Sequence, residues 1–112
     1  MASVQELLQT FGIGHRYLGN AVLKQALELA LEDESRLCCV SRRLYPLICQ
    51  RVNCSQSTIE RNIRTVITHV WQTHADKLIE IADYELIQPP TVTEFLDILT
   101  THLMRTSPMP SA

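Results

Sequence analysis

The stretch "YPLICQRVNCSQSTIERNIRTVITHVW", residues 45–71, predicts two helices joined by a tight turn. A proline in the first turn of a helix loses no hydrogen bond, so Pro46 can begin a short helix over residues 46–52. Asn53 tolerates left-handed backbone angles and therefore ends that helix. Two helices separated by so short a turn are typical of a helix–turn–helix.

The second helix of this stretch begins at Ser55 or Ser57 and runs to about Trp71. Ser57 followed by Glu60 matches a capping box, in which the two side chains satisfy N–H groups at the start of a helix.

Apolar residues recur along this second helix at helical spacing. At about 100° per residue, a buried stripe centres on Ile63 and includes Ile59, Val66, Ile67 and Val70, with Trp71 at its edge. On the open face lie Ser57, Arg61, Arg64 and Thr68, flanked by Glu60. Arginine recognises guanine, a carboxylate recognises the cytosine amine, and hydroxyls bind phosphates or bases. The open face therefore has side chains suited to reading DNA, although any exposed helix face is polar.

The composition favours a single all-α domain. Three glycines and 5% aromatic residues among 112 are too few for a β-sandwich or barrel. The further helices that we expect are an N-terminal one capped by Ser3 and ended by Gly12, one capped by Asn20 over 21–34, one over 35–45, a short one near 76–84, and a last one capped by Thr93. We assign residues 1–104 to the domain and expect 105–112, with two prolines, to be a disordered tail.

The net charge of -2 hides an asymmetry. Residues 36–64 contain six arginines and one acid, Glu60, and sum to +5, whereas the remainder of the chain sums to -7. A solvated surface is the ordinary explanation of a short charge run. This segment is long and patterned, so we favour a polyanionic partner.

The sequence also bounds where the protein works and what it does not do. We read the four cysteines as reduced thiols and, with no secretory signal or membrane span, expect a cytoplasmic protein. His69 and His74 are five residues apart, about 140° around a regular helix, and no C-x-x-C occurs. We therefore expect no metal site, no cofactor and no enzymatic activity.

The stretch around the turn resembles the DNA-binding effector domain of the master response regulator that starts sporulation in endospore-forming bacteria. The residues that carry the resemblance are Leu44-Tyr45-Pro46, Ile48, Asn53, Ser57, Glu60-Arg61, Ile63-Arg64, Ile67 and Trp71. Weaker matches, among them Gly12, Gly19, Asp33 and Glu94-Phe95, extend it over roughly residues 12–104.

The resemblance implies a six-helix, all-α domain whose recognition helix, about residues 55–71, reads a promoter box in the major groove of double-stranded DNA. Ser57, Glu60, Arg61 and Arg64 would then make base and phosphate contacts. Thr58 occupies a further contact position, where the family commonly has an arginine, so the target sequence is left open. Arg42 and Arg43 precede the motif, where phosphate contacts are expected. Thr68 extends the open face.

Two further partners are expected besides DNA, a second copy of the chain and a receiver domain. Independently of the resemblance, the predicted helices show no long a/d seam, so we expect a monomer or weak dimer in solution. Adjacent DNA sites would then bring two copies together as a homodimer on the DNA. The family's effector domain usually follows a phosphoacceptor receiver domain, which these 112 residues do not contain. The alternatives are an excised or free-standing effector, a relative that lost phosphorylation control, or a receiver domain supplied elsewhere. A further alternative is a protein–protein interaction module that kept the fold and lost specific DNA binding.

Overall fold

The computed structural model describes residues 4–14 and 18–106, and the described chain is helical with no strand. Its α-helices are α1 (Val4–Thr10), α2 (Leu18–Glu32), α3 (Tyr45–Val52), α4 (Gln56–Ala82) and α5 (Val92–Thr106). Between α2 and α3 lie a 3₁₀-helix, η1 (Glu34–Cys39), and a π-helical turn, η2 (Val40–Leu44). The all-α prediction is confirmed. The resemblance implies six helices and the sequence pattern predicts seven, whereas the described residues form five α-helices.

The count differs because α4 joins two of the predicted helices and because the helix predicted over 35–45 is not an α-helix. The helix expected to end near Trp71 continues to the kink at His74, and the segment from there to Ala82 is the short helix expected near 76–84. Within α4 only His74 leaves helical geometry, with φ -138° and ψ 33°, so two helical segments meet there at a kink. Thr73 donates its hydroxyl to the carbonyl oxygen of His69 at 2.7 Å, and such bonding to residue i−4 often bends a helix.

The segment between α2 and α3 also differs from the sequence prediction, which is one α-helix over residues 35–45. Its first half, η1, is wound more tightly than an α-helix, and its second half, η2, more loosely. Asp33 caps η1 by accepting a hydrogen bond from the Ser35 N–H at 3.0 Å. Cys39 then has φ -149° and ψ 81°, which interrupts the helical path before η2 begins. The Asp33 cap and the non-helical backbone at Cys39 therefore divide the predicted helix into two short helical segments.

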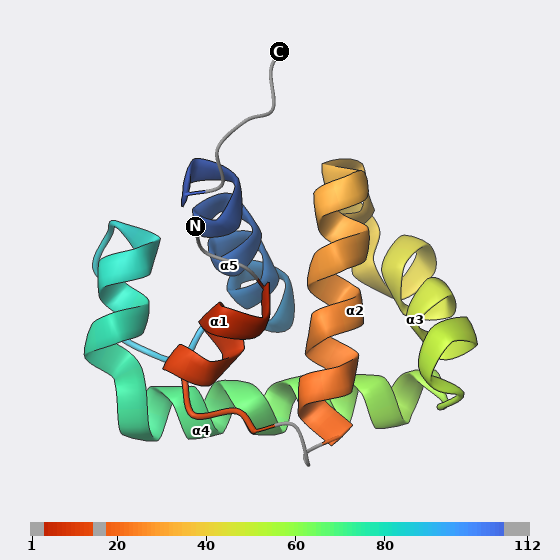
Figure 1. Ribbon diagram of the computed structural model, residues 1–112, viewed down its shortest axis with the longest axis horizontal. Coiled ribbons are helices and arrows are strands. Elements are labelled where there is room, and N and C mark those ends of the chain that lie inside the picture. The colour runs from red at the N-terminus through yellow and green to blue at the C-terminus, as the bar shows by residue number, and fades with distance from the viewer. Residues whose placement is uncertain (1–3, 15–17, 107–112) are drawn as a thin grey trace.

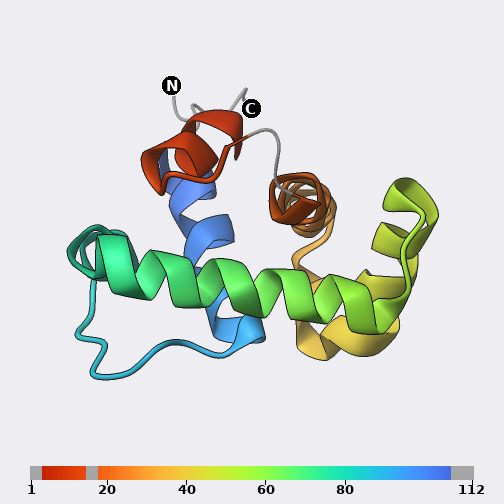
Figure 2. The same ribbon diagram turned by 90° about the horizontal axis from the view of Figure 1, so that it is seen from below.

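The helices surround one core, and α4 runs across its base. Figure 1 shows α2, α3 and α5 above the first part of α4, whose last part turns upward at the left, and Figure 2 shows α4 crossing in front of the other helices when the molecule is seen from below. These three helices pack against α4. The closest approach is at Gly19, where a Cβ atom would lie 2.7 Å from Cγ2 of Val66. A side chain at position 19 would therefore push α2 away from α4.

The ends of the helices test the expected caps. Gly12 (φ +75°) and Asn53 (φ 55°) adopt left-handed angles after α1 and α3, as predicted. Asn20 is not a cap: it lies buried inside α2 and donates to the carbonyl oxygen of Ile13 at 3.0 Å. Thr91, not Thr93, caps α5 by accepting from the Glu94 N–H at 3.1 Å. The expected cap Ser3 lies outside the described residues.

Residues near the C-terminus are more ordered than expected. Arg105 and Thr106, assigned to the tail, form the last turn of α5, and residues 107–112 lie outside the described part of the chain. All four cysteines are free thiols. No helix in the described ranges is long and apolar enough to cross a membrane.

Candidate nucleic-acid interface

The turn between α3 and α4 is short and held by local hydrogen bonds. Asn53 donates its N–H to the carbonyl oxygen of Cys49 at 2.9 Å, and the half-buried Cys54 fills the turn, with Sγ 3.5 Å from the Val52 carbonyl oxygen. Ser55 then caps α4, because its Oγ accepts from the Thr58 N–H at 3.2 Å.

The cap decides between the two serines proposed from the sequence. Ser55 is the N-cap, so the capping box expected at Ser57 and Glu60 is wrong. Ser57 lies two residues further along and is exposed, with its Oγ 3.4 Å from that of Ser55. Because Ser57 does not hold the backbone of the first turn, its side chain is free to contact a partner.

The two faces of α4 are those predicted. Ile59, Ile63, Val66, Ile67 and Val70 are buried, and Trp71 is half-buried against the core. Ser57, Glu60, Arg61, Arg64 and Thr68 are all exposed. The buried stripe fixes the rotation of α4, so these five side chains lie on one outward surface of a rigid helix; we call them the open face.

A carboxylate and a guanidinium lie one turn apart on the open face. Arg64 Nε lies 3.7 Å from Glu60 Oε2, with the side chains 68% and 48% exposed respectively. Exposed pairs of this kind contribute about 0.3–0.5 kcal/mol to stability. The pair therefore adds little to the fold and leaves both groups available to a partner.

Tyr45, at the start of α3, connects the open face to the rest of the domain. Its ring is 4% exposed. Burial and the nearby Glu60 carboxylate raise the pKa of its phenol to about 12, an effect that Arg64 partly offsets. The beginning of α3 therefore packs beside the Glu60–Arg64 pair of α4.

Two threonines predicted as contacts are placed differently from each other. Thr58 is half-buried, and its Oγ1 lies 2.9 Å from Ser55 Oγ, so it supports the helix start instead of joining the open face. Thr68 is exposed and donates to the Arg64 carbonyl oxygen at 3.1 Å. That bond uses its only proton, so the Thr68 hydroxyl meets a partner as an acceptor.

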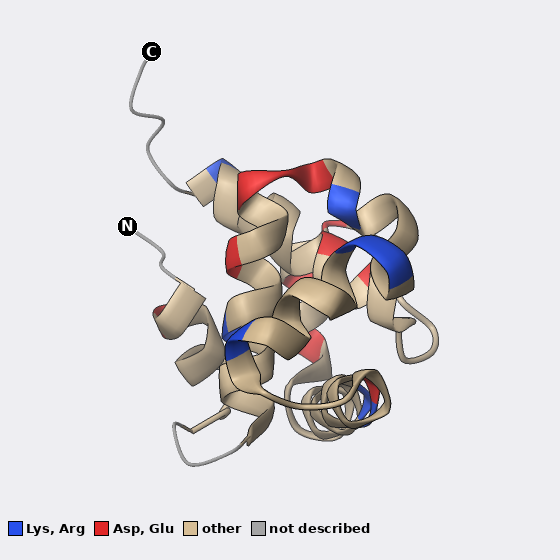
Figure 3. Ribbon diagram, turned by 90° about the vertical axis from the view of Figure 1, so that its right-hand side faces the viewer, with Lys and Arg blue, Asp and Glu red and all other residues tan. Residues whose placement is uncertain are grey.

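Arg42 and Arg43, in η2, also differ. Arg43 donates to the Ser35 carbonyl oxygen at 3.1 Å and lies 3.7 Å from the Asp33 carboxylate, so it ties η2 to η1. Arg42 is exposed and has no ion-pair or hydrogen-bond partner among the described residues. Figure 3 shows the basic positions of η2 and α4 toward one edge of the molecule.

Acids from outside the basic segment neutralise part of it. Arg36 pairs with Glu32 at 3.3 Å, and Arg51 lies 3.8 Å from the same carboxylate while donating to Gln25 at 3.0 Å. In the charge count from the sequence, these acids belong to the acidic part of the chain outside residues 36–64. The folded chain nevertheless brings them into contact with arginines of the basic segment. Of the six arginines, only Arg42 and Arg61 have no side-chain partner among the described residues.

A hollow beside the open face brings in residues that the sequence did not indicate. It has a volume of about 330 Å³ and lies between α4, at Arg64 and Thr68, and the loop before α5. Gln88 and Thr91 line its far wall. They lie some twenty residues from Thr68 along the chain, and no local pattern links them to it. The open face thus continues into a polar-edged depression.

The arrangement is similar to a known family. Residues 4–103 match the family described as sporulation initiation factor Spo0A C terminal. This match spans α1 to α5 and includes the turn, the open face and η2. The chain belongs to this family of DNA-binding effector domains of sporulation regulators.

Proposed function

We propose that this domain is a sequence-specific transcriptional regulator, in which α3 and α4 form a helix–turn–helix and the first half of α4 enters the major groove of DNA. The observation that carries the proposal is the open face. Its five polar side chains project from a helix whose opposite side is fixed in the core. A rigid helix with this chemistry fits the width of the major groove.

Each member of the open face has a role that its chemistry suggests. Arg64 and Arg61 donate to guanine O6 and N7, and Glu60 accepts from the cytosine amine. The 3.7 Å approach of Arg64 to Glu60 limits the directions that both side chains take before DNA arrives. Ser57 and Thr68 contact phosphates or base edges at the two ends of this row.

Recognition differs from that of relatives with an arginine in place of Thr58. The Thr58 hydroxyl is engaged with Ser55, and the side chain is too short to reach across a groove. One base contact is therefore absent, and we expect a less constrained position in the DNA target.

Phosphate contacts from η2 position the helix. Arg42 is the exposed cation there without a partner in the described residues. Arg43 contributes once its contact with Asp33, in which both side chains are about half-exposed, gives way to a phosphate. Such contacts orient the protein on the duplex without specifying its sequence.

A homodimer on adjacent DNA sites is part of the proposal. Two copies on one duplex raise each other's effective concentration even when their mutual contact is small. Titration onto duplexes with one site or two sites measures this gain. A half-turn change in spacing should remove it, because one copy then faces the opposite side of the DNA.

A protein-interaction module is the second candidate. The pairing of Arg36, Arg43 and Arg51 with acids or amides favours it, because it reduces the charge available to phosphates.

Selection of bound duplexes from a random pool, followed by a salt series on the selected duplex, tests both readings. DNA recognition predicts one enriched motif and a binding constant that falls steeply with salt. No enriched motif together with a flat salt dependence would favour the protein-interaction reading.

A further inference from the structure

Two histidine rings meet at the kink of α4. In a regular helix, His69 and His74 would point about 140° apart. The non-helical backbone of His74 changes that direction, and the ring centroids lie 6.3 Å apart with their planes tilted by 50°. The pair therefore belongs to the folded structure, although the spacing in the sequence argues against it.

A hydrogen-bond chain fixes the tautomer of His74. Thr73 uses its only hydroxyl proton to donate to the His69 carbonyl oxygen at 2.7 Å. The 2.7 Å contact between Thr73 Oγ1 and His74 Nδ1 must then be donated by the imidazole. In the neutral ring this places the proton on Nδ1 and leaves a lone pair on Nε2. Metal-binding histidines are commonly oriented by such a bond from the other ring nitrogen.

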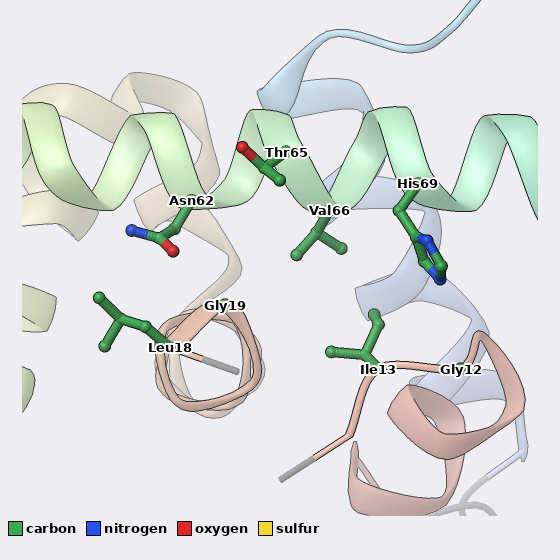
Figure 4. Close-up of a pocket in the computed structure, with 8 residues that line it drawn as sticks. All are labelled: Gly12, Ile13, Leu18, Gly19, Asn62, Thr65, Val66 and His69. Carbon is green, nitrogen blue, oxygen red and sulfur yellow. The ribbon is translucent and has the colours of Figure 1, made fainter. Parts of the chain in front are cut away.

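The two rings converge on a residue without a side chain. A Cβ atom on Gly12 would lie 3.4 Å from His74 Cε1 and 3.5 Å from His69 Nε2. Gly12 thus leaves these ring edges uncovered. A cavity of about 190 Å³ lies on the His69 side, with Gly12, Ile13 and His69 in its wall. Figure 4 shows the His69 ring directed toward Ile13 and Gly12.

We propose that His69 and His74 bind one divalent transition-metal ion through their Nε2 atoms. Neutral imidazole suits zinc, nickel and copper. Rings that share an ion at about 2.0–2.1 Å per bond have centroids roughly 5–6 Å apart, so the two rings, now 6.3 Å apart, must move closer together to bind it. No third His, Cys, Asp or Glu joins the pair in residues 4–14 and 18–106. Water from the cavity fills the remaining positions.

Packing alone is the competing explanation of the histidine pair. Phe11 meets the His74 ring edge-on, with centroids 6.2 Å apart, and this contact needs no ion. The distinguishing measurement is calorimetric titration with nickel ions alone, in the absence of DNA. Nickel is chosen because softer ions also bind the cysteine thiols. The Cys38→Ser/Cys39→Ser protein controls for those thiols, and His102→Gln controls for the loss of an unrelated histidine.

We expect one nickel ion per chain, and binding at least tenfold weaker in His69→Gln and in His74→Gln. Both controls should bind as the wild type does. Thr73→Val should weaken binding while leaving both ligands in place, because it removes the bond that orients His74. Since His69 is exposed, its substitution tests the site even if His74→Gln perturbs the kink. Wild-type nickel affinity in His69→Gln, or its loss in the cysteine variant, would overturn the proposal.

Discussion

Replacing Ser55 with alanine should destabilise the domain, whereas replacing Ser57 should not. Ser55 Oγ accepts from the Thr58 N–H at 3.2 Å and satisfies one of the unpaired donors at the start of α4. Loss of an N-cap serine costs about 1 kcal/mol, within a range of roughly 0.5–2. The other contacts of this hydroxyl, at 2.9 and 3.4 Å, are exposed side-chain bonds that add little.

The assay is urea unfolding followed by circular dichroism. Ser55→Ala should lower the free energy of unfolding by about 1 kcal/mol at an unchanged slope, and lower Tm by about 4–5 °C. Ser57→Ala is the matched control, with an expected change within about 0.5 kcal/mol. A larger loss for Ser57→Ala than for Ser55→Ala would refute the assignment of the cap and restore the capping box expected from the sequence.

Three further substitutions test separate parts of the structure. Arg42→Ala should weaken binding to all duplexes alike and reduce the slope of log affinity against log salt by about 1. Thr100→Val should raise the unfolding free energy by about 1 kcal/mol, because the Thr100 hydroxyl is buried without a partner in the described chain; Thr100→Ser should not. Burial and Arg105 lower the pKa of His102 below 6.5, so stability falls as pH drops through that value, and His102→Gln should flatten the urea-unfolding profile there.

The fold follows from the sequence where periodicity is strong. The stripe from Ile59 to Val70 predicts both the helix and its buried side, since only one rotation of α4 buries all five residues. The open face was predictable for the same reason, because it is the side of α4 opposite the buried stripe. Pro46 and Asn53 likewise fix the limits of α3 through backbone preferences that need no tertiary information.

Other features depend on contacts that local sequence does not encode. No proline or glycine marks the kink at His74, so the sequence places the break between the two helical segments of α4 only roughly, between Trp71 and Asp76. Ser55 and Ser57 are both acceptable caps by residue type, and only the path of the turn separates them. The pairing of Arg51 with Gln25 joins α3 to α2 across 26 residues. Such pairs decide which arginines remain available to bind a partner, and the charge pattern in the sequence does not reveal these pairs.

The most direct test of the central claim is the ratio of affinities for the selected duplex and a scrambled one. Arg64→Ala should lose on the order of 1–3 kcal/mol of this discrimination, because a guanine contact is removed. Lys77→Ala removes an exposed cation further along the same helix and should keep the wild-type ratio. An unchanged ratio in Arg64→Ala would contradict the claim that the open face of α4 reads DNA.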